Sequence, residues 1–248
     1  MYKNEMKGKV ALVTGGTSGL GYGISKAFLE QGVSVIAIYL NNDKKAAEVT
    51  KELSKIGSFK AVKANVADED AMKKVFSELE QLDFLVNCAG ISHEDDILKL
   101  SMAQIREVFE TMLFGKIICC RCAFPLLKKS SYPRIVNIAS RFATKPLIGA
   151  IPLTAAEAGI VMFTKNLALE WAGEGIKVNC VSPSLTVNTG SYYAFYTDED
   201  AERVGKTNPS GRLGRIEDTS NAVLFLCSKA ADYITGENLN VSGGILLK

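Results

Sequence analysis

The chain has 248 residues, of which 47% are hydrophobic and 23% are charged. Its 29 basic and 27 acidic residues leave a net charge of +2, so charge indicates neither a nucleic-acid partner nor an anionic membrane surface. A chain of this length and composition can bury a full core as one compact soluble domain.

No apolar run approaches the roughly 20 residues that cross a bilayer, and the segment from Met1 to Lys7 lacks the apolar core of a signal peptide. We therefore expect a cytoplasmic protein with no membrane partner. The six cysteines lie mostly in apolar segments, without paired CxxC spacing or a histidine cluster. They are expected to be reduced core residues, and no metal site is predicted.

Short β-rich runs alternate with longer segments of helical period along the whole chain. This alternation predicts an α/β fold in which a doubly wound, Rossmann-like parallel sheet of about seven strands carries helices on both faces. No linker or repeat interrupts it, so residues 1–248 are expected to form a single domain. The predicted strands are residues 10–13, 33–38, 59–64, 84–86, 134–138, 177–181 and 239–241.

Two early segments show apolar residues at helical spacing. They are Ile24, Ala27 and Phe28 in one, and Met72, Val75, Phe76 and Leu79 in the other. The least regular stretch, residues 184–210, follows a late strand. A long excursion there is expected to form a lid over a binding cleft.

A glycine-rich segment directly follows the first strand and opens the first long helix. Gly15, Gly19 and Gly21 would let the chain turn tightly and approach a pyrophosphate, whose charge is favoured by free amides at a helix N-terminus. An ordinary strand-to-helix turn explains such glycines equally well when they stand alone. Their position between a predicted strand and a predicted helix favours a dinucleotide site.

Further motifs extend this pattern along the chain. They are Asn87-Cys88-Ala89-Gly90 after the fourth strand, the strand that ends at Ser140, Gly211-Arg212-Leu213-Gly214-Arg215, and residues 234–244. Together with the glycine turn they make the chain resemble the short-chain dehydrogenase/reductase family. Within that family, the chain is similar to the reductases that act on 3-oxoacyl groups carried by acyl carrier protein.

In that family an Asn, a Ser, a Tyr and a Lys form the proton relay, and the resemblance locates each position here. The serine is retained as Ser140, while Met112, Leu153 and Glu157 occupy the other three positions. Leucine has no ionisable group, and glutamate reverses the charge of the lysine. Loss of general acid catalysis typically slows a reaction about a hundred- to ten-thousand-fold, so ordinary carbonyl reduction is expected to be very slow. Met112 and Leu153 are then most simply apolar packing residues.

The resemblance places Glu157 beside the nicotinamide ribose, where a carboxylate can accept a hydrogen bond from a ribose hydroxyl. At about 6 Å from the ring and an effective dielectric near 20, it would favour the oxidised cationic form by at most about 3 kcal/mol. We therefore expect a relative preference for NAD(P)+ over NAD(P)H.

The choice of nucleotide is expected at the end of the second strand, where Tyr39 stands at the usual position of an acidic ribose ligand. Because the carboxylate is missing, a 2′-phosphate fits, with Asn41, Asn42 or Lys44 as contacts, so NADP is favoured over NAD. The cofactor positions that the resemblance implies are Gly15, Thr17, Ser18, Gly19, Leu20, Gly21, Tyr39, Asn41, Asn65, Val66, Asn87, Ala89, Gly90, Glu157 and Pro183.

A replacement proton donor would restore the enzyme interpretation. The predicted lid offers Tyr192, Tyr193 and Tyr196, and His93 follows the Asn87 motif. Arg141 and Lys145 follow Ser140 and could add positive charge near the cleft. Pocket walls and solvated surface positions are the simpler interpretation of all six residues.

Two functions of different class therefore remain open. In the first, the chain is a non-catalytic, NADP(H)-binding partner subunit that assembles as a dimer or tetramer with itself or with an active homologous reductase. In the second, it reduces 3-oxoacyl thioesters on acyl carrier protein, in fatty-acid or polyketide-like biosynthesis, with a non-standard proton donor. The apolar run Ile117, Ile118, Cys119, Cys120, Ala123 and Phe124 suits a subunit interface or a core helix equally well.

Overall fold

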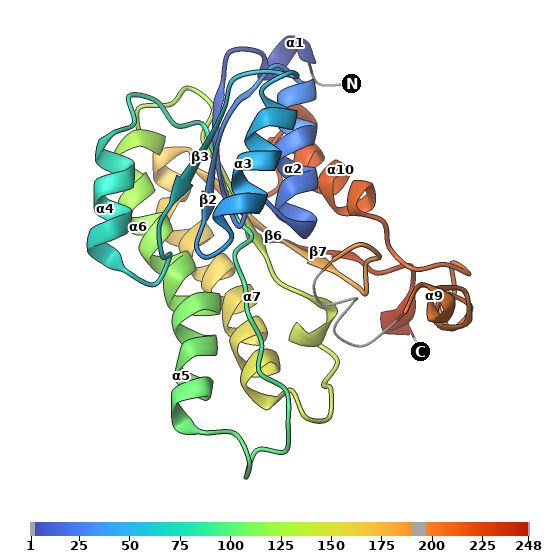
Figure 1. Cartoon of the computed structure of the whole chain (residues 1–248). Helices are drawn as coiled ribbons and strands as arrows, with labels where there is room; N and C mark the ends of the chain where they lie inside the picture. The colour runs from blue at the N-terminus through green and yellow to red at the C-terminus, as the bar shows by residue number, and fades with distance from the viewer. Residues whose placement is uncertain (1–2, 190–196, 248) are drawn as a thin grey trace.

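The computed structural model describes residues 3–189 and 197–247. In this part of the chain seven strands form one parallel sheet in the order β3-β2-β1-β4-β5-β6-β7 (Figure 1). The fold class and all seven predicted strands are confirmed, with end points that differ by at most a few residues. The strands are β1 (Val10–Thr14), β2 (Ser34–Tyr39), β3 (Phe59–Lys63), β4 (Phe84–Asn87), β5 (Arg134–Ile138), β6 (Lys177–Pro183) and β7 (Asn238–Val241).

The central strands are buried on both faces, as expected of a parallel sheet covered by helices. Every residue of β4 and β5 is buried. The strand order reverses between β1 and β4, and their register pairs Thr14 with Asn87. The chain segments that leave these two strands therefore start side by side at the carboxyl edge of the sheet, where ligands bind in open α/β folds.

One face of the sheet carries α2 (Gly19–Glu30), α3 (Asp43–Leu53) and α10 (Ile216–Leu226). Ile24 and Phe28 of α2 pack in the same apolar cluster as Val223 and Leu224 of α10, which confirms the first predicted helical face. Gly23 allows this approach, since a Cβ there would collide with the side chain of Ile216.

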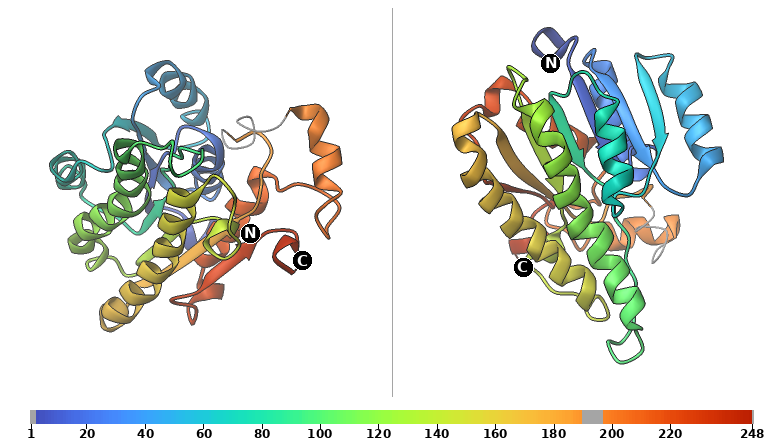
Figure 2. Two further views of the ribbon diagram at one scale, coloured as in Figure 1. Left: turned by 90° about the horizontal axis from the view of Figure 1, so that it is seen from below. Right: turned by 90° about the vertical axis from the view of Figure 1, so that its left-hand side faces the viewer.

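The other face carries α4 (Glu69–Ser77), α6 (Gly115–Leu127) and α7 (Ile151–Trp171), and α5 (Met102–Phe109) extends beyond the sheet (Figures 1 and 2). Met72, Val75 and Phe76 are buried against the sheet as predicted. Leu79 was wrongly included in that helix, because α4 ends at Ser77. It packs partly buried against the same cluster through a tight turn in which its N–H donates to the carbonyl of Phe76.

The remaining helices are short. They are α1 (Lys3–Met6), α9 (Asp198–Gly205) and the 3₁₀ turns Arg141–Ala143, Ala172–Glu174, Lys229–Ala231 and Ile245–Leu247. A π-helical turn, Glu110–Phe114, joins α5 to α6. Such turns are frequent at functional sites, and this one contains Met112.

All six cysteines are free, as predicted, and four of them are buried. Within residues 3–189 and 197–247 no helix is long and apolar enough to cross a membrane. Across the same residues no three His, Cys, Asp or Glu side chains come together as a metal site.

Candidate cofactor and active site

The glycine-rich turn between β1 and α2 has the backbone that the sequence predicts for an anion cradle. Gly15 and Gly19 have φ angles of +67° and +49°, which residues with a Cβ rarely adopt. A Cβ on Gly21 would collide with the carbonyl of Gly15. Ser18 is the N-cap of α2 but makes no side-chain capping bond to the first amides of the helix. This arrangement suits a pyrophosphate at the helix N-terminus.

The loop after β4 lies against this turn. A Cβ on Gly15 would stand 3.2 Å from the Cα of Ala89. Thr14 Oγ1 accepts hydrogen bonds from the amides of Cys88, at 2.9 Å, and Ala89, at 3.0 Å. The carbonyl of Ala89 in turn accepts a hydrogen bond of 3.0 Å from Lys116 Nζ. The glycine turn and the Asn87 motif are therefore held as one surface at the carboxyl edge.

The side chain of Asn87 does not belong to that surface. It is fully buried and donates to Asn137 Oδ1 at 2.9 Å, and Asn137 donates to Thr164 Oγ1 at 2.9 Å. This chain of amides links β4, β5 and α7 in the interior. Any contact of Asn87 with a nucleotide would therefore have to come from its backbone.

The four positions of the usual relay lie close together. Met112, 6% exposed, and the half-buried Leu153 belong to one small apolar cluster with Ala139, next to Ser140, and with Ala156, next to Glu157. Met112 Sδ also accepts a hydrogen bond of 3.3 Å from the amide of Ile91. Met112 and Leu153 therefore pack among apolar side chains at these positions.

Glu157 is the charged member of this group, and only 4% of it is exposed. The hydroxyl and the amide of Ser140 both favour the charged form of its carboxylate. Burial raises the pKa of Glu157 from 4.5 to about 7, against the opposing effects of the Lys116 cation and the two Ser140 donors. Its Oε2 atom is buried without a hydrogen-bond partner among the described residues.

Lys116 is the functional candidate that the sequence interpretation missed. It is 3% exposed, and burial lowers its pKa while the charge of Glu157 acts in the opposite direction. The signal was present in the sequence, because Lys116 is the single charged residue at the start of the apolar run from Gly115 to Cys120. A lysine is almost never fully buried unless it has a partner.

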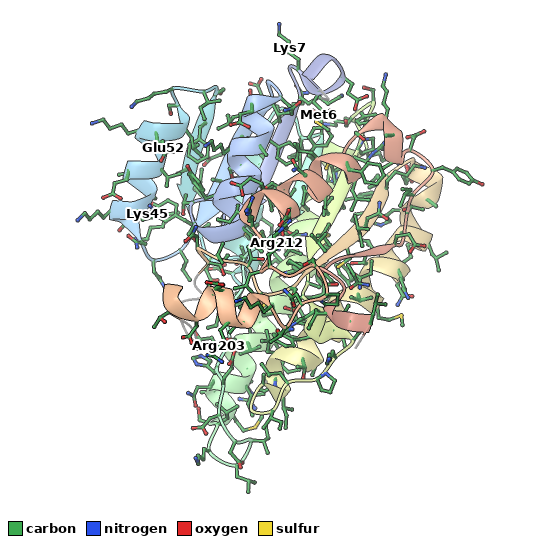
Figure 3. The ribbon with its side chains drawn as sticks, turned by 90° about the vertical axis from the view of Figure 1, so that its right-hand side faces the viewer. Met6, Lys7, Lys45, Glu52, Arg203 and Arg212 are labelled. Carbon is green, nitrogen blue, oxygen red and sulfur yellow. The ribbon has the colours of Figure 1, made fainter. Side chains whose placement is uncertain are left out.

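The second strand ends in a polar cluster of its own. Asp43, beside Tyr39, forms an ion pair of 2.8 Å with Lys63 on the neighbouring strand β3. Asn42 caps α3 by accepting from the amide of Lys45 at 2.9 Å, and the side chain of Lys45 points away from the protein (Figure 3). The sequence interpretation named the exposed residues Asn41, Asn42 and Lys44 as contacts of a 2′-phosphate. Lys63 is a further cation at this edge.

The other predicted cofactor residues surround these two regions. Thr17 and Pro183 are buried, Leu20 is half-buried and Ser18 is exposed. Asn65 is exposed and accepts from the amide of Ala67 at 3.0 Å. Val66 is buried against α6, where a Cβ on Gly115 would stand 2.8 Å from Val66 Cγ2.

The alternative proton donors and the nearby cations lie as follows. His93 pairs with Glu107 of α5 at 2.8 Å, at the rim of the protein. The guanidinium of Arg141 lies over the ring of Phe142, 4.8 Å from its centroid, and Lys145 is exposed. Tyr192, Tyr193 and Tyr196 lie outside the described residues. Just before them, the chain passes the glycine turn, since Thr189 lies 3.9 Å from a Cβ placed on Gly19.

A model of the enoyl-(acyl carrier protein) reductase family matches residues 15–246 of this chain. The chain belongs to the short-chain dehydrogenase/reductase family. It is 34% identical to the 3-oxoacyl-[acyl-carrier-protein] reductase FabG of Aquifex aeolicus, over 97% of this chain and 98% of the relative. It is 33% identical to the FabG of Escherichia coli, over 98% of this chain and 99% of the relative. The resemblance drawn from the sequence motifs is thereby confirmed.

Solved structures agree with the fold. A putative short-chain alcohol dehydrogenase from Sinorhizobium meliloti superposes with a TM-score of 0.90 at 31% identity, covering 98% of each chain. A putative NAD(P)-dependent gluconate 5-dehydrogenase from Beutenbergia cavernae, which contains bound NADP at low occupancy, superposes with a TM-score of 0.89 at 32% identity, again covering 98% of each chain. The comparisons therefore support the prediction of NADP as the cofactor.

Proposed function

We propose that this protein binds NADP(H) at the carboxyl edge of its sheet and reduces carbonyl groups very slowly on its own, acting as a cofactor-binding partner subunit. The observation that carries this proposal is the apolar packing of Met112 and Leu153 beside Ser140 and Glu157. The chain keeps the family's nucleotide-binding surface, while apolar side chains occupy two positions of the family's proton relay. This combination fits nucleotide binding better than carbonyl reduction.

The residues present fit the nucleotide. The backbone of Gly15, Gly19 and Gly21 would cradle the pyrophosphate, because side chains at Gly15 and Gly21 would meet backbone atoms. The loop at Ala89 and Gly90 would pass along the ribose, and the polar cluster at Tyr39 and Lys63 would meet the 2′-phosphate. A bound nicotinamide supplies hydride transfer chemistry in this family.

The position of the family's usual proton donor offers no transferable proton. Leu153 has no ionisable group at the place of the usual donor. The Ser140 hydroxyl remains, but it accepts a hydrogen bond of 3.1 Å from the amide of Phe142 and lies beside Glu157, which carries the opposite charge to the family lysine. General acid catalysis normally contributes about a hundred- to ten-thousand-fold, so its loss here accounts for a slow reaction without loss of binding.

A partner role is supported by the outer faces of the helices that carry the relay positions. Met162 and Leu169 of α7 are 56% and 79% exposed, and Phe114 at the start of α6 is 45% exposed. In the apolar run of α6, by contrast, Cys119, Cys120 and Ala123 are core residues. Assembly as a dimer or tetramer, a cytoplasmic location and a lid over residues 184–210 complete the proposal.

Two assays test this proposal on the purified full-length chain. NADPH binding is measured by fluorescence titration, and reduction of a 3-oxoacyl thioester of acyl carrier protein is measured alone and with an active reductase added. Binding without turnover, together with faster turnover by the added reductase, is the expected result. Rapid reduction by the chain alone would favour the second function, a reductase with a non-standard donor.

A further inference from the structure

Two opposite charges are buried at the carboxyl edge of the sheet, on neighbouring helices. Lys116 comes from α6 and Glu157 from α7, and they are 3% and 4% exposed. They attract one another electrostatically without a direct ion pair, both lying in the described part of the chain. Burying two charges away from water is costly, so each must have partners that compensate its desolvation.

Lys116 has a partner of its own at the nucleotide surface. Its ammonium donates to the carbonyl of Ala89, in the loop that packs against Gly15. Lys116 therefore holds the loop at Ala89 and places its positive charge near Glu157. The family carries a lysine on α7, at the position of Glu157. In this chain the positive charge comes from Lys116 on α6, and α7 carries the acidic Glu157.

Glu157 is only partly satisfied. Ser140 favours its charged form, yet Oε2 is buried and has no partner within the described residues. Leaving a buried acceptor unpaired destabilises a protein by about 1–3 kcal/mol, and more for a charged group. A ligand hydroxyl at Oε2 would remove that penalty.

Few other groups near this pair can titrate around neutral pH. The charged or ionisable groups that face Glu157 are Lys116 from α6 and Cys180 from β6, and Cys88 and Cys119 face Lys116. Burial raises the pKa of Cys88 to about 11 and that of Cys180 to about 12, and it raises the pKa of Cys119 well above its usual value. These thiols stay protonated near pH 7, so they add no charge beside Glu157 and Lys116 there.

We propose that Lys116 is a positioning residue that holds Glu157 as the acceptor for a ribose hydroxyl of the bound nucleotide, so that nucleotide binding drives a proton off Glu157. This inference rests on the proposed function, because it requires the nucleotide to bind at this edge. The proton leaves the carboxyl group for the buffer, the ribose hydroxyl donates to Oε2, and the carboxylate stays between Ser140 and the charge of Lys116. A cationic nicotinamide adds to the same effect.

Proton release on binding is the direct readout. With a pKa of about 7 in the free protein, Glu157 is about half protonated at pH 7, so up to about half a proton is released per nucleotide bound. Calorimetric titration of the full-length, nucleotide-free chain with NADP+, in two buffers of different ionisation enthalpy, measures this number. The release should be greatest near pH 7 or slightly below and should vanish by pH 9.

Four proteins are compared in that titration. The wild type should release the proton and Glu157→Gln should release none. Lys116→Met should move the pH of greatest release upward by about one unit or more, since Glu157 loses its cation, and Lys116→Arg should restore the wild-type profile. A purely structural role of Lys116 would weaken binding or folding without moving this pH profile.

The outcomes separate the two claims. Proton release that persists in Glu157→Gln, or an unchanged pH profile in Lys116→Met, overturns the inference while the proposed function stands. A wild type that binds no NADP+ overturns both. Should Lys116→Met fail to fold, the titration of Glu157 by ¹³C NMR in the wild type and in Lys116→Arg decides, because a carboxyl that titrates near its ordinary value of 4.5 contradicts the proposal.

Discussion

The free energy of unfolding should respond to Glu157→Gln in a way that depends on pH. Glu157 titrates at about 7 in the folded chain and near 4.5 when unfolded, because burial disfavours its charge. The contribution of protonated Glu157 to the free energy of unfolding is therefore complete below about pH 4.5, and it is lost as pH rises through about 7. Each unit of pKa shift is worth about 1.4 kcal/mol, so the total loss approaches about 3 kcal/mol.

Glutamine cannot ionise, so the variant should not suffer this loss. The variant also leaves Lys116 without its counter-charge, an effect that stays constant until the lysine itself titrates. The informative quantity is therefore the change with pH of the stability difference between variant and wild type. It should shift in favour of the variant by about 2–3 kcal/mol between pH 5 and pH 8, or about 4–12 °C in Tm for a chain of this size.

Urea unfolding of the nucleotide-free protein at pH 5 and pH 8 measures this shift. Glu170→Gln is the matched control, because Glu170 lies on the same helix with its side chain exposed, and it should show no pH-dependent difference. A stability difference between Glu157→Gln and wild type that is equal at both pH values would refute the electrostatic reasoning.

Three further predictions concern the nucleotide site. Gly21→Ala should abolish NADPH binding in a fluorescence titration, because its Cβ meets the Gly15 carbonyl, whereas Gly173→Ala, with open space around it, should bind normally. Lys63→Gln should weaken NADP+ binding about tenfold more than NAD+ binding if Lys63 meets the 2′-phosphate, and the exposed Lys60→Gln serves as control. The preference for NADP+ over NADPH, measured as a ratio of Kd values, should be larger at pH 8 than at pH 6, because Glu157 is charged only above about pH 7; an equal ratio would contradict this.

The strands could be predicted from the sequence because each is a short β-rich run between turn residues. The position of the site followed from them, since Gly15 and Asn87 both stand where strands end. Parallel pairing then brings Thr14 opposite Asn87, and the two loops meet. Local pattern and sheet geometry were enough for this part of the molecule.

The electrostatics of the site could not be predicted in the same way. Whether Lys116 is buried depends on which face of α6 meets the sheet, and the π-helical turn before α6 shifts that face. The raised pKa of Glu157 arises from packing of α7 against residues distant in sequence. The positions of Met112, Leu153 and Glu157 came from the family resemblance, whereas their packing required the three-dimensional structure.

We propose that this chain keeps a nucleotide-binding frame around a lost proton relay. The triple variant Met112→Asn, Leu153→Tyr and Glu157→Lys tests it most directly, with NADPH affinity and 3-oxoacyl thioester reduction measured for variant and wild type side by side. We expect similar NADPH affinity in both proteins and a rate at least a hundredfold higher in the variant. A wild type that fails to bind NADPH, or that already reduces the thioester as fast as a folded, NADPH-binding triple variant, would contradict it.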